Sequence, residues 1–244
     1  MSVMSVLWAI AFGICPQRPS HSLFLGGQQM PIEARMAGMF GGFVVAAAYG
    51  WAVGRGRAMR LPGRAMTLTL IGFIALTLAP ARSAGVGVDG VNAFLYDLRL
   101  PHLYAPNILL RLGTGLLTGV AFAGLVVPAF NSTVWASGPD IGFLEQPRHV
   151  LGALLFEAVY FGVAISGAGQ FLYPVSLLAV LGIPILIGMI GSIVLAAILR
   201  RENRAVRSAD LFPLLVGGLA VAVVMLGILS GPRFLIFGTG PMAF

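Results

Sequence analysis

The residues of this chain that are best suited to chemistry lie in two polar segments between its long apolar stretches. The first segment begins at Cys15, ends near Gly38 and contains Glu33 and Arg35. The second segment combines two carboxylates, an imidazole, an amide and a guanidinium: Asp89, Asp97, His102, Asn107 and Arg111. One thiol forms neither an internal disulfide nor a four-thiolate metal cage, and cysteine, glutamate and methionine together suit no single metal. We therefore expect a polar cluster here, and assign no metal ligand and no catalytic residue.

A further candidate, Glu157, lies alone in the apolar stretch 154–160. An ionised carboxylate at the centre of a bilayer costs about 3 kcal/mol on insertion scales, so this group must be protonated, paired or open to a wet cavity. In the structural interpretation it is a neutral acid that is hydrogen-bonded to a neighbouring helix through a threonine or tyrosine hydroxyl. In the functional interpretation it binds a proton or a ligand.

Arg111 and Arg35 each stand near the start of an apolar stretch. A structural role is the pairing of Arg111 with Asp89, Asp97 or Glu33, which would fix the 81–107 loop. The functional alternative is an anionic lipid or substrate headgroup held between the two arginines. His21, His102 and His149 all lie outside the middle of any expected helix, which argues against axial ligation of a haem. The motifs of nucleotide binding, triad hydrolysis and zinc peptidases are absent, so lipids are the one cofactor class we expect.

These residues must be positioned by membrane helices, because the composition does not suit a soluble globule. Of 244 residues, 58% are hydrophobic and 9% are charged. The net charge of +7 is the balance of fifteen basic residues, all arginine, against eight acidic ones. Two short loops, 54–64 and 200–210, carry four arginines each. Such loops orient membrane proteins and contact anionic lipids, so nucleic acid is not an expected partner.

Hydropathy predicts an all-α polytopic bundle that forms a single membrane domain over residues 1–244. A short apolar segment, Val3 to Ile14, either spans thinly or lies at the interface. Six longer helices are expected at 34–53, 65–80, 108–130, 150–168, 175–199 and 211–230. Pairs of small residues one helical turn apart, such as Gly38 with Gly42 and Gly115 with Gly119, predict close packing between helices of the same chain.

The two arginine loops predict the orientation. With both in the cytoplasm of a prokaryotic plasma (inner) membrane, segments 16–33, 81–107 and 169–174 lie outside, and so does the tail after Ser230. Both polar segments then lie at the same membrane face.

The two polar segments also resemble an uncharacterised family of prokaryotic multi-pass membrane proteins, known as a domain of unknown function. Its members typically carry Cys-His-Gln and, further on, Gly-Gly and Cys-Ala-Arg-Cys-Thr-Gly at a helix start, then Asp-Gly-Xaa-Asn, Pro-Asn and Arg-Leu-Xaa-Thr-Gly. The matching residues here are Cys15, Gln17, Pro19, Ser22, Gly26, Gly27, Pro31, Ala34, Arg35, Gly38, Asp89, Gly90, Asn92, Leu103, Tyr104, Pro106, Asn107, Arg111, Leu112, Thr114 and Gly115. The resemblance covers roughly residues 15–135.

The departures from that pattern concern the thiols. The resemblance implies a thiol redox centre or a soft-metal site in the family. This chain has Pro16 after Cys15, and Glu33 and Met36 where the family has the cysteines of its second motif. We interpret it as a member that kept the scaffold and lost that site.

We therefore expect a non-catalytic multi-pass subunit that packs in, or helps to assemble, a larger energy-converting or transport complex, with the bilayer and other membrane subunits as partners. The alternative is a small carrier or membrane enzyme for a lipid-soluble or anionic substrate that uses Glu157 and Arg111. A third possibility is a redox or metal site that Cys15 completes with a thiol of another chain.

Overall fold

The computed structural model describes residues 2–78, 92, 95, 96, 99–101, 104, 105 and 107–238. Within these residues the chain is mostly helical, as predicted, and it forms seven α-helices. Their bounds are α1 (Val3–Phe12), α2 (Ala34–Ala52), α3 (Arg64–Leu78), α5 (Ile108–Val134), α6 (Pro147–Ile165), α7 (Leu172–Ile198) and α8 (Phe212–Phe237). Short 3-10 turns precede α7 and α8, at Gly169–Phe171 and Ser208–Leu211.

Four helices are long and apolar enough to cross a membrane: α5, α6, and α7 and α8 with the turns that precede them. α2 has 19 residues but falls below the same hydropathy threshold. Its sequence contains four glycines and begins with Ala34-Arg35. The apolar stretch of α3, Arg64–Ala75, is shorter than 18 residues. The structure therefore supports a membrane protein, and membrane criteria alone single out four of the six expected spans.

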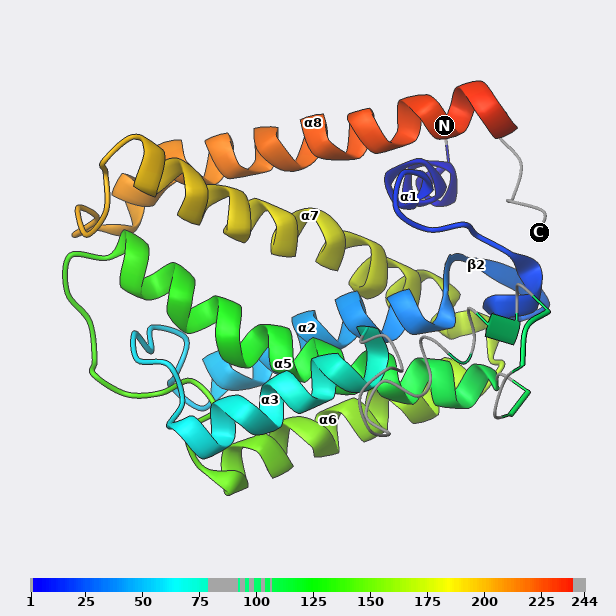
Figure 1. Cartoon of the computed structure of the whole chain (residues 1–244), viewed down its shortest axis with the longest axis horizontal. Helices are drawn as coiled ribbons and strands as arrows, with labels where there is room; N and C mark the ends of the chain where they lie inside the picture. The colour runs from blue at the N-terminus through cyan, green and yellow to red at the C-terminus, as the bar shows by residue number, and fades with distance from the viewer. Residues whose placement is uncertain are drawn as a thin grey trace.

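α2 is the central helix, and glycines set its closest contacts (Figure 1). A Cβ atom on Gly115 of α5 would come within 2.3 Å of the Arg35 carbonyl oxygen of α2. One on Gly119 would come within 2.5 Å of the Phe43 nitrogen. Only a hydrogen atom fits at these positions, so the two backbones lie in direct contact. The predicted use of small residues for packing within the chain is confirmed at this crossing.

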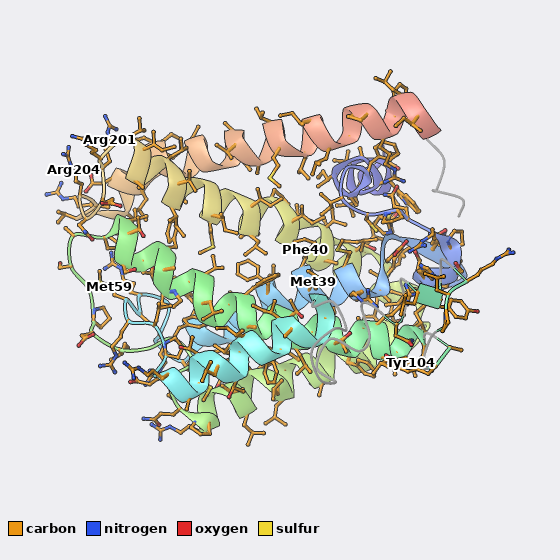
Figure 2. All side chains as sticks on the ribbon, viewed as in Figure 1. Met39, Phe40, Met59, Tyr104, Arg201 and Arg204 are labelled. Atoms are coloured by element: carbon orange, nitrogen blue, oxygen red, sulfur yellow. The ribbon has the colours of Figure 1, made fainter. Side chains whose placement is uncertain are left out.

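The loops on one side of the helices form what we call the arginine end. Arg55 donates to the Gly142 carbonyl at 2.6 Å, and the Arg57 guanidinium lies 3.9 Å from the centroid of the Trp135 ring. The second arginine loop joins them, because the Asn203 N–H donates to the Thr133 carbonyl. Figure 2 shows Arg201 and Arg204 projecting there, with Tyr104 at the opposite end of the molecule. The loops that should share a membrane side are therefore neighbours.

The opposite end, which we call the hairpin end, contains the one strand pair among the described residues, and the all-α prediction did not include it. β1 (Ser22–Leu25) and β2 (Gln28–Glu33) are antiparallel, and Gly26 and Gly27 connect them. Both glycines have positive φ, at 59° and 74°, which is the backbone of a tight two-residue hairpin turn. The Gly26 N–H donates to the Gly167 carbonyl at 2.7 Å, so the hairpin tip is fixed to the loop between α6 and α7.

The first and last helices, α1 and α8, also meet at the hairpin end. Figure 1 shows α1 end-on while the other helices run across the view, so α1 lies across their direction. The prediction that the last helix stops at residue 230 was wrong, because α8 continues past Pro232 to Phe237. The added residues are mostly apolar, and the charged Arg233 finds backbone acceptors beside α1. This extension brings α8 over α1.

Candidate functional site at the hairpin end

The polar cluster at the hairpin end is built around Cys15. The chain leaves α1 in a turn in which the Cys15 N–H donates to the Ala11 carbonyl at 3.0 Å. The Cys15 side chain is 1% exposed, and its Sγ accepts a hydrogen bond from the Glu33 N–H at 3.2 Å. Burial, reinforced by the nearby Glu33 charge, raises the pKa of this thiol to about 12. A thiol in this state is a poor nucleophile and a poor metal ligand.

Glu33, the last residue of β2, uses both of its carboxylate oxygens inside the cluster. Oε1 accepts from the backbone N–H and from Nε of Arg18, each at 3.1 Å. Oε2 lies 3.7 Å from Nδ1 of His21. Burial alone would raise the pKa of this carboxyl group, but hydrogen bonds from His21 and Arg18 outweigh it and hold the pKa at about 2. Glu33 is thus an ionised carboxylate that is paired with Arg18.

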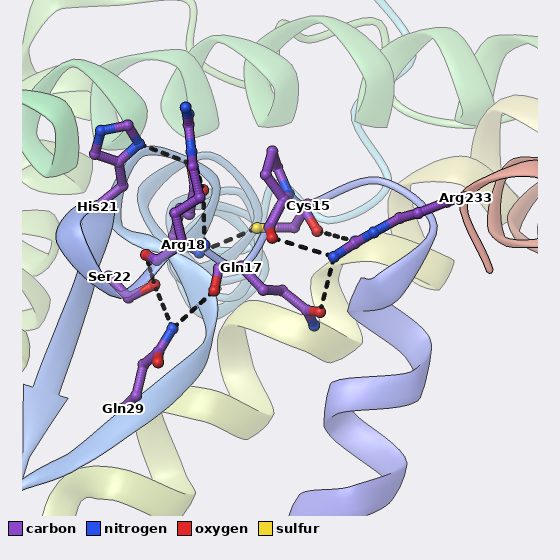
Figure 3. Close-up of polar contacts among 9 residues, drawn as sticks. Cys15, Gln17, Arg18, His21, Ser22, Gln29 and Arg233 are labelled. Atoms are coloured by element: carbon purple, nitrogen blue, oxygen red, sulfur yellow. Dashed lines mark hydrogen bonds and ion pairs between the residues drawn. The ribbon is translucent and has the colours of Figure 1, made fainter. Parts of the chain in front are cut away.

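Two glutamine side chains connect α1 to the hairpin. Gln17 is 3% exposed, and its Nε2 donates to the carbonyl oxygens of Trp8 and Pro31, each at 3.0 Å. Gln29 donates to the Gln17 carbonyl at 3.0 Å and to Ser22 Oγ at 3.1 Å. The backbone of Gln17 has a φ of 60°, a strained value that these bonds maintain. The amide groups therefore position the backbone, and Figure 3 shows the Gln29 side chain bound to the Gln17 carbonyl.

Arg233 closes the cluster from α8, and the sequence analysis missed it. Its guanidinium donates to the carbonyls of Phe12 and Cys15 and, at 3.1 Å, to that of Pro16. It also lies 4.0 Å from the centroid of the Phe12 ring. Carbonyls at the end of a helix lack intrahelical partners, so a cation there is favourable. A lone arginine in the apolar run after Ser230 was the available signal, since such a residue needs a polar partner in a membrane.

Arg35 and Arg111 lie at neighbouring helix starts, as expected. α5 begins after Asn107, whose side chain accepts from the Leu109 N–H at 2.7 Å and caps the helix. Arg111 is in the first turn of α5 and is 4% exposed. The contact between Gly115 and the Arg35 carbonyl sets the two helix starts side by side. Asp89, Asp97 and His102 lie outside the described residues.

Glu157 is separate from this cluster. It lies midway along α6 and is 2% exposed, and its Oε2 would be 3.1 Å from a Cβ atom on Gly42 of α2. Neither carboxyl oxygen has a hydrogen-bond partner among the residues that the structure describes. The nearby Tyr160 hydroxyl donates instead to the Ala37 carbonyl at 3.3 Å. Among the described residues, the expected hydrogen bond from a hydroxyl group of a neighbouring helix to Glu157 is therefore not formed, and the hydroxyl of Tyr160, on the same helix, is used elsewhere.

The polar cluster forms contacts between different parts of the same chain. Within the described ranges, no three His, Cys, Asp or Glu side chains group as metal ligands would. The thiol is buried, the carboxylate is neutralised, and the arginine of α8 is bound to carbonyl oxygens. These contacts hold α1, the hairpin and α8 together.

Residues 15–125 match the model of a family described as predicted membrane protein (DUF2085). This is the uncharacterised family that the two polar segments resemble. The resemblance is confirmed over a region that contains the hairpin, α2, α3 and most of α5. Glu157 and Arg233 lie outside it. Comparison with curated proteins and with solved structures gave no match.

Proposed function

We propose that this chain crosses a prokaryotic plasma (inner) membrane six times, through α2, α3, α5, α6, α7 and α8, with the arginine end in the cytoplasm. The alternating direction of these helices in Figure 1 supports the proposal. So does the length of α2, since 19 residues at 1.5 Å each reach about 28 Å, close to the apolar thickness of a bilayer. α1 then lies along the outer interface, and both chain ends are outside.

We further infer that the protein is a non-catalytic subunit that packs in, or helps to assemble, a larger energy-converting or transport membrane complex. The observation that carries this inference is the internal use of the reactive side chains at the hairpin end. Cys15, Glu33 and Arg233 bind residues of their own chain and none of them points a free reactive group at solvent. The hairpin end therefore supplies a rigid shape.

The surface of α8 is consistent with a partner subunit. α8 packs chiefly on α7, where Ser192 donates to the Leu214 carbonyl at 2.9 Å. Its other side exposes large apolar side chains, with Val223 at 62%, Val224 at 60% and Ile228 at 67%. Within the described residues no second helix covers this side to the extent that α7 covers the first. A transmembrane helix of another subunit fits such a surface by packing alone.

Purification in mild detergent tests the subunit proposal. The tagged full chain should copurify with a defined set of membrane proteins, and its deletion should reduce that complex on native gels. Val224→Trp on the open face of α8 should release the partners. Leu155→Trp, at a position of similar exposure on α6, is the matched control and should retain them. A monodisperse monomer whose deletion changes no complex would overturn the proposal.

One observation favours the second function, a carrier or membrane enzyme that uses Glu157 and Arg111. A buried acid without a hydrogen-bond partner among the described residues is costly, and groups of this kind in membranes mark functional sites. Glu157→Gln separates the two proposals, because it preserves shape and removes the exchangeable acid. Assembly of the complex should survive this change if the protein is a subunit. Loss of transport or turnover with intact assembly would favour the carrier or enzyme.

A further inference from the structure

A cleft of about 680 Å³ lies between α1 and α8, outside the hydrogen-bonded cluster. Trp8 and Phe12 of α1 form one wall, and Gly227 and Phe234 of α8 form the other. This volume is within the range of about 300–1,000 Å³ that is typical of ligand pockets. The lining is mostly apolar, and the side chain of Gln17 lies at its border.

The walls of the cleft are fixed rather than collapsible. Arg233 lies over the Phe12 ring and binds the carbonyl at the end of α1, which sets the crossing of the two helices. At that crossing a Cβ atom on Gly13 would come within 2.8 Å of the Leu226 carbonyl oxygen, so the backbones already touch. Gly227 and Gly231, which follow Leu226 and Ser230 in α8, line the cleft, and a Cβ atom on either would meet nothing within 4 Å. The cleft is the open space beside these two glycines.

The surroundings of the cleft on α8 are apolar and open. Phe234 is 54% exposed and Leu235 is 84% exposed. If α8 crosses the membrane, as proposed above, this surface faces hydrocarbon. Apolar cavities exclude water and accept apolar ligands. Acyl chains are the apolar groups that a bilayer supplies in excess, so they are the natural occupants of an apolar cleft in this wall.

We propose that the cleft between α1 and α8 binds one acyl chain of a membrane phospholipid, held between Trp8 and Gly227, with the lipid headgroup at the hairpin end. The inference rests on the proposed membrane placement of α8, but not on the subunit function. The bound acyl chain packs against both helices, as a neighbouring helix would, and stabilises the position of α1 against α8.

Fluorescence quenching tests the site because Trp8 lines it. Trp51→Phe and Trp135→Phe leave Trp8 as the single tryptophan, in full-length protein in detergent micelles. A dibrominated phosphatidylcholine added to the micelles should quench Trp8 at low mole fraction and then reach a plateau. Gly227→Leu, which places a side chain in the open space, should raise the half-quenching mole fraction by about tenfold or more.

Gly162→Leu is the matched control, because Gly162 of α6 is exposed and also has nothing within 4 Å of an added Cβ atom. It should leave the quenching curve unchanged. Ala9→Leu, on the α1 wall, repeats the test if Gly227→Leu fails to fold. Quenching that rises linearly without a plateau, or that ignores both cleft variants, would overturn the acyl-chain site. Either result is independent of whether partner subunits copurify.

Discussion

Glu33→Gln is the change that tests the polar cluster most directly. It keeps the shape of the side chain but removes the charge that Arg18 and His21 bind. The pKa of this carboxyl group falls from 4.5 to about 2 on folding, which corresponds to about 3 kcal/mol of interaction with the ionised form. Its side chain keeps 10% of its surface in solvent, and the amide retains part of the hydrogen bonding. We therefore expect a loss of about 2 kcal/mol of local stability.

The single cysteine supplies the assay. Cys15 lies against Glu33 and is 1% exposed, so a maleimide modifies it only after the cluster opens. When closing is faster than modification, the labelling rate follows the population of the open form. A loss of about 2 kcal/mol then accelerates labelling roughly 30-fold at pH 7. Glu202→Gln, a surface change at the arginine end, should leave the rate unchanged.

A second variant separates opening from a direct effect of charge on the thiol. Removing the Glu33 charge also lowers the pKa of Cys15, which could by itself increase reactivity. Arg18→Met removes the partner cation instead. Compared with Glu33→Gln, loss of this cation changes the pKa of the Cys15 thiol in the opposite direction. Both variants, however, favour opening of the cluster. Slower labelling in Arg18→Met, or wild-type labelling in Glu33→Gln, would refute the reasoning.

The same pair predicts an acid dependence. Because folding lowers the pKa of Glu33, its stabilisation is complete above pH 4.5 and is lost as the pH falls towards about 2. An acid-tolerant dipyridyl disulfide should therefore report increased opening of the wild-type cluster over that window. Glu33→Gln should show no such dependence, and an equal dependence in both proteins would assign it to other groups.

Two further changes test the contacts that hold the helices. Arg233→Met should lower the midpoint of thermal unfolding, because loss of its carbonyl contacts costs about 2–4 kcal/mol. Arg204→Met, in the exposed loop, is the control and should not lower it. The same midpoint in both variants would contradict the role of Arg233. Gly115→Ala should cost about 2 kcal/mol or more, because its Cβ atom would meet the Arg35 carbonyl at 2.3 Å. Gly113→Ala, whose nearest heavy atom would be at 3.9 Å, is the control and should be neutral or stabilising, as thermal unfolding in detergent can show.

The helices were predictable because hydropathy carries their signal. The predicted segments 34–53 and 175–199 correspond to helices at Ala34–Ala52 and Leu172–Ile198. The hairpin was missed because strands this short bury too few residues to show a period, although Gly26-Gly27 between Leu25 and Gln28 is a turn signal. Hydropathy reports how apolar each stretch of the chain is. It carries no information on the contact that fixes the hairpin tip to the distant loop between α6 and α7.

The sequence predicted where the candidate site lies but not which of its residues are paired with one another. Sequence reasoning grouped Cys15, Glu33, Arg35 and Arg111 at one end, and the structure places them there. The lone Arg233 in an apolar run was a signal, but its partners could not be predicted, because the contact joins positions at opposite ends of the chain. Nor could sequence reasoning foresee that Glu157 lacks a hydroxyl partner among the described residues, which depends on where the neighbouring hydroxyl group points.

Glu33 stands where the resemblance places a family cysteine, and it has a structural role in this chain. The resemblance gives the family a cysteine at this position, and here the Glu33 N–H donates to Cys15 Sγ at 3.2 Å. The two chain positions are therefore in contact in this protein. In this chain the Arg18 ion pair and the three carbonyl contacts of Arg233 tie β2 and α8 to the end of α1. Charge-assisted hydrogen bonds of this kind fix the geometry of the hairpin end without redox chemistry.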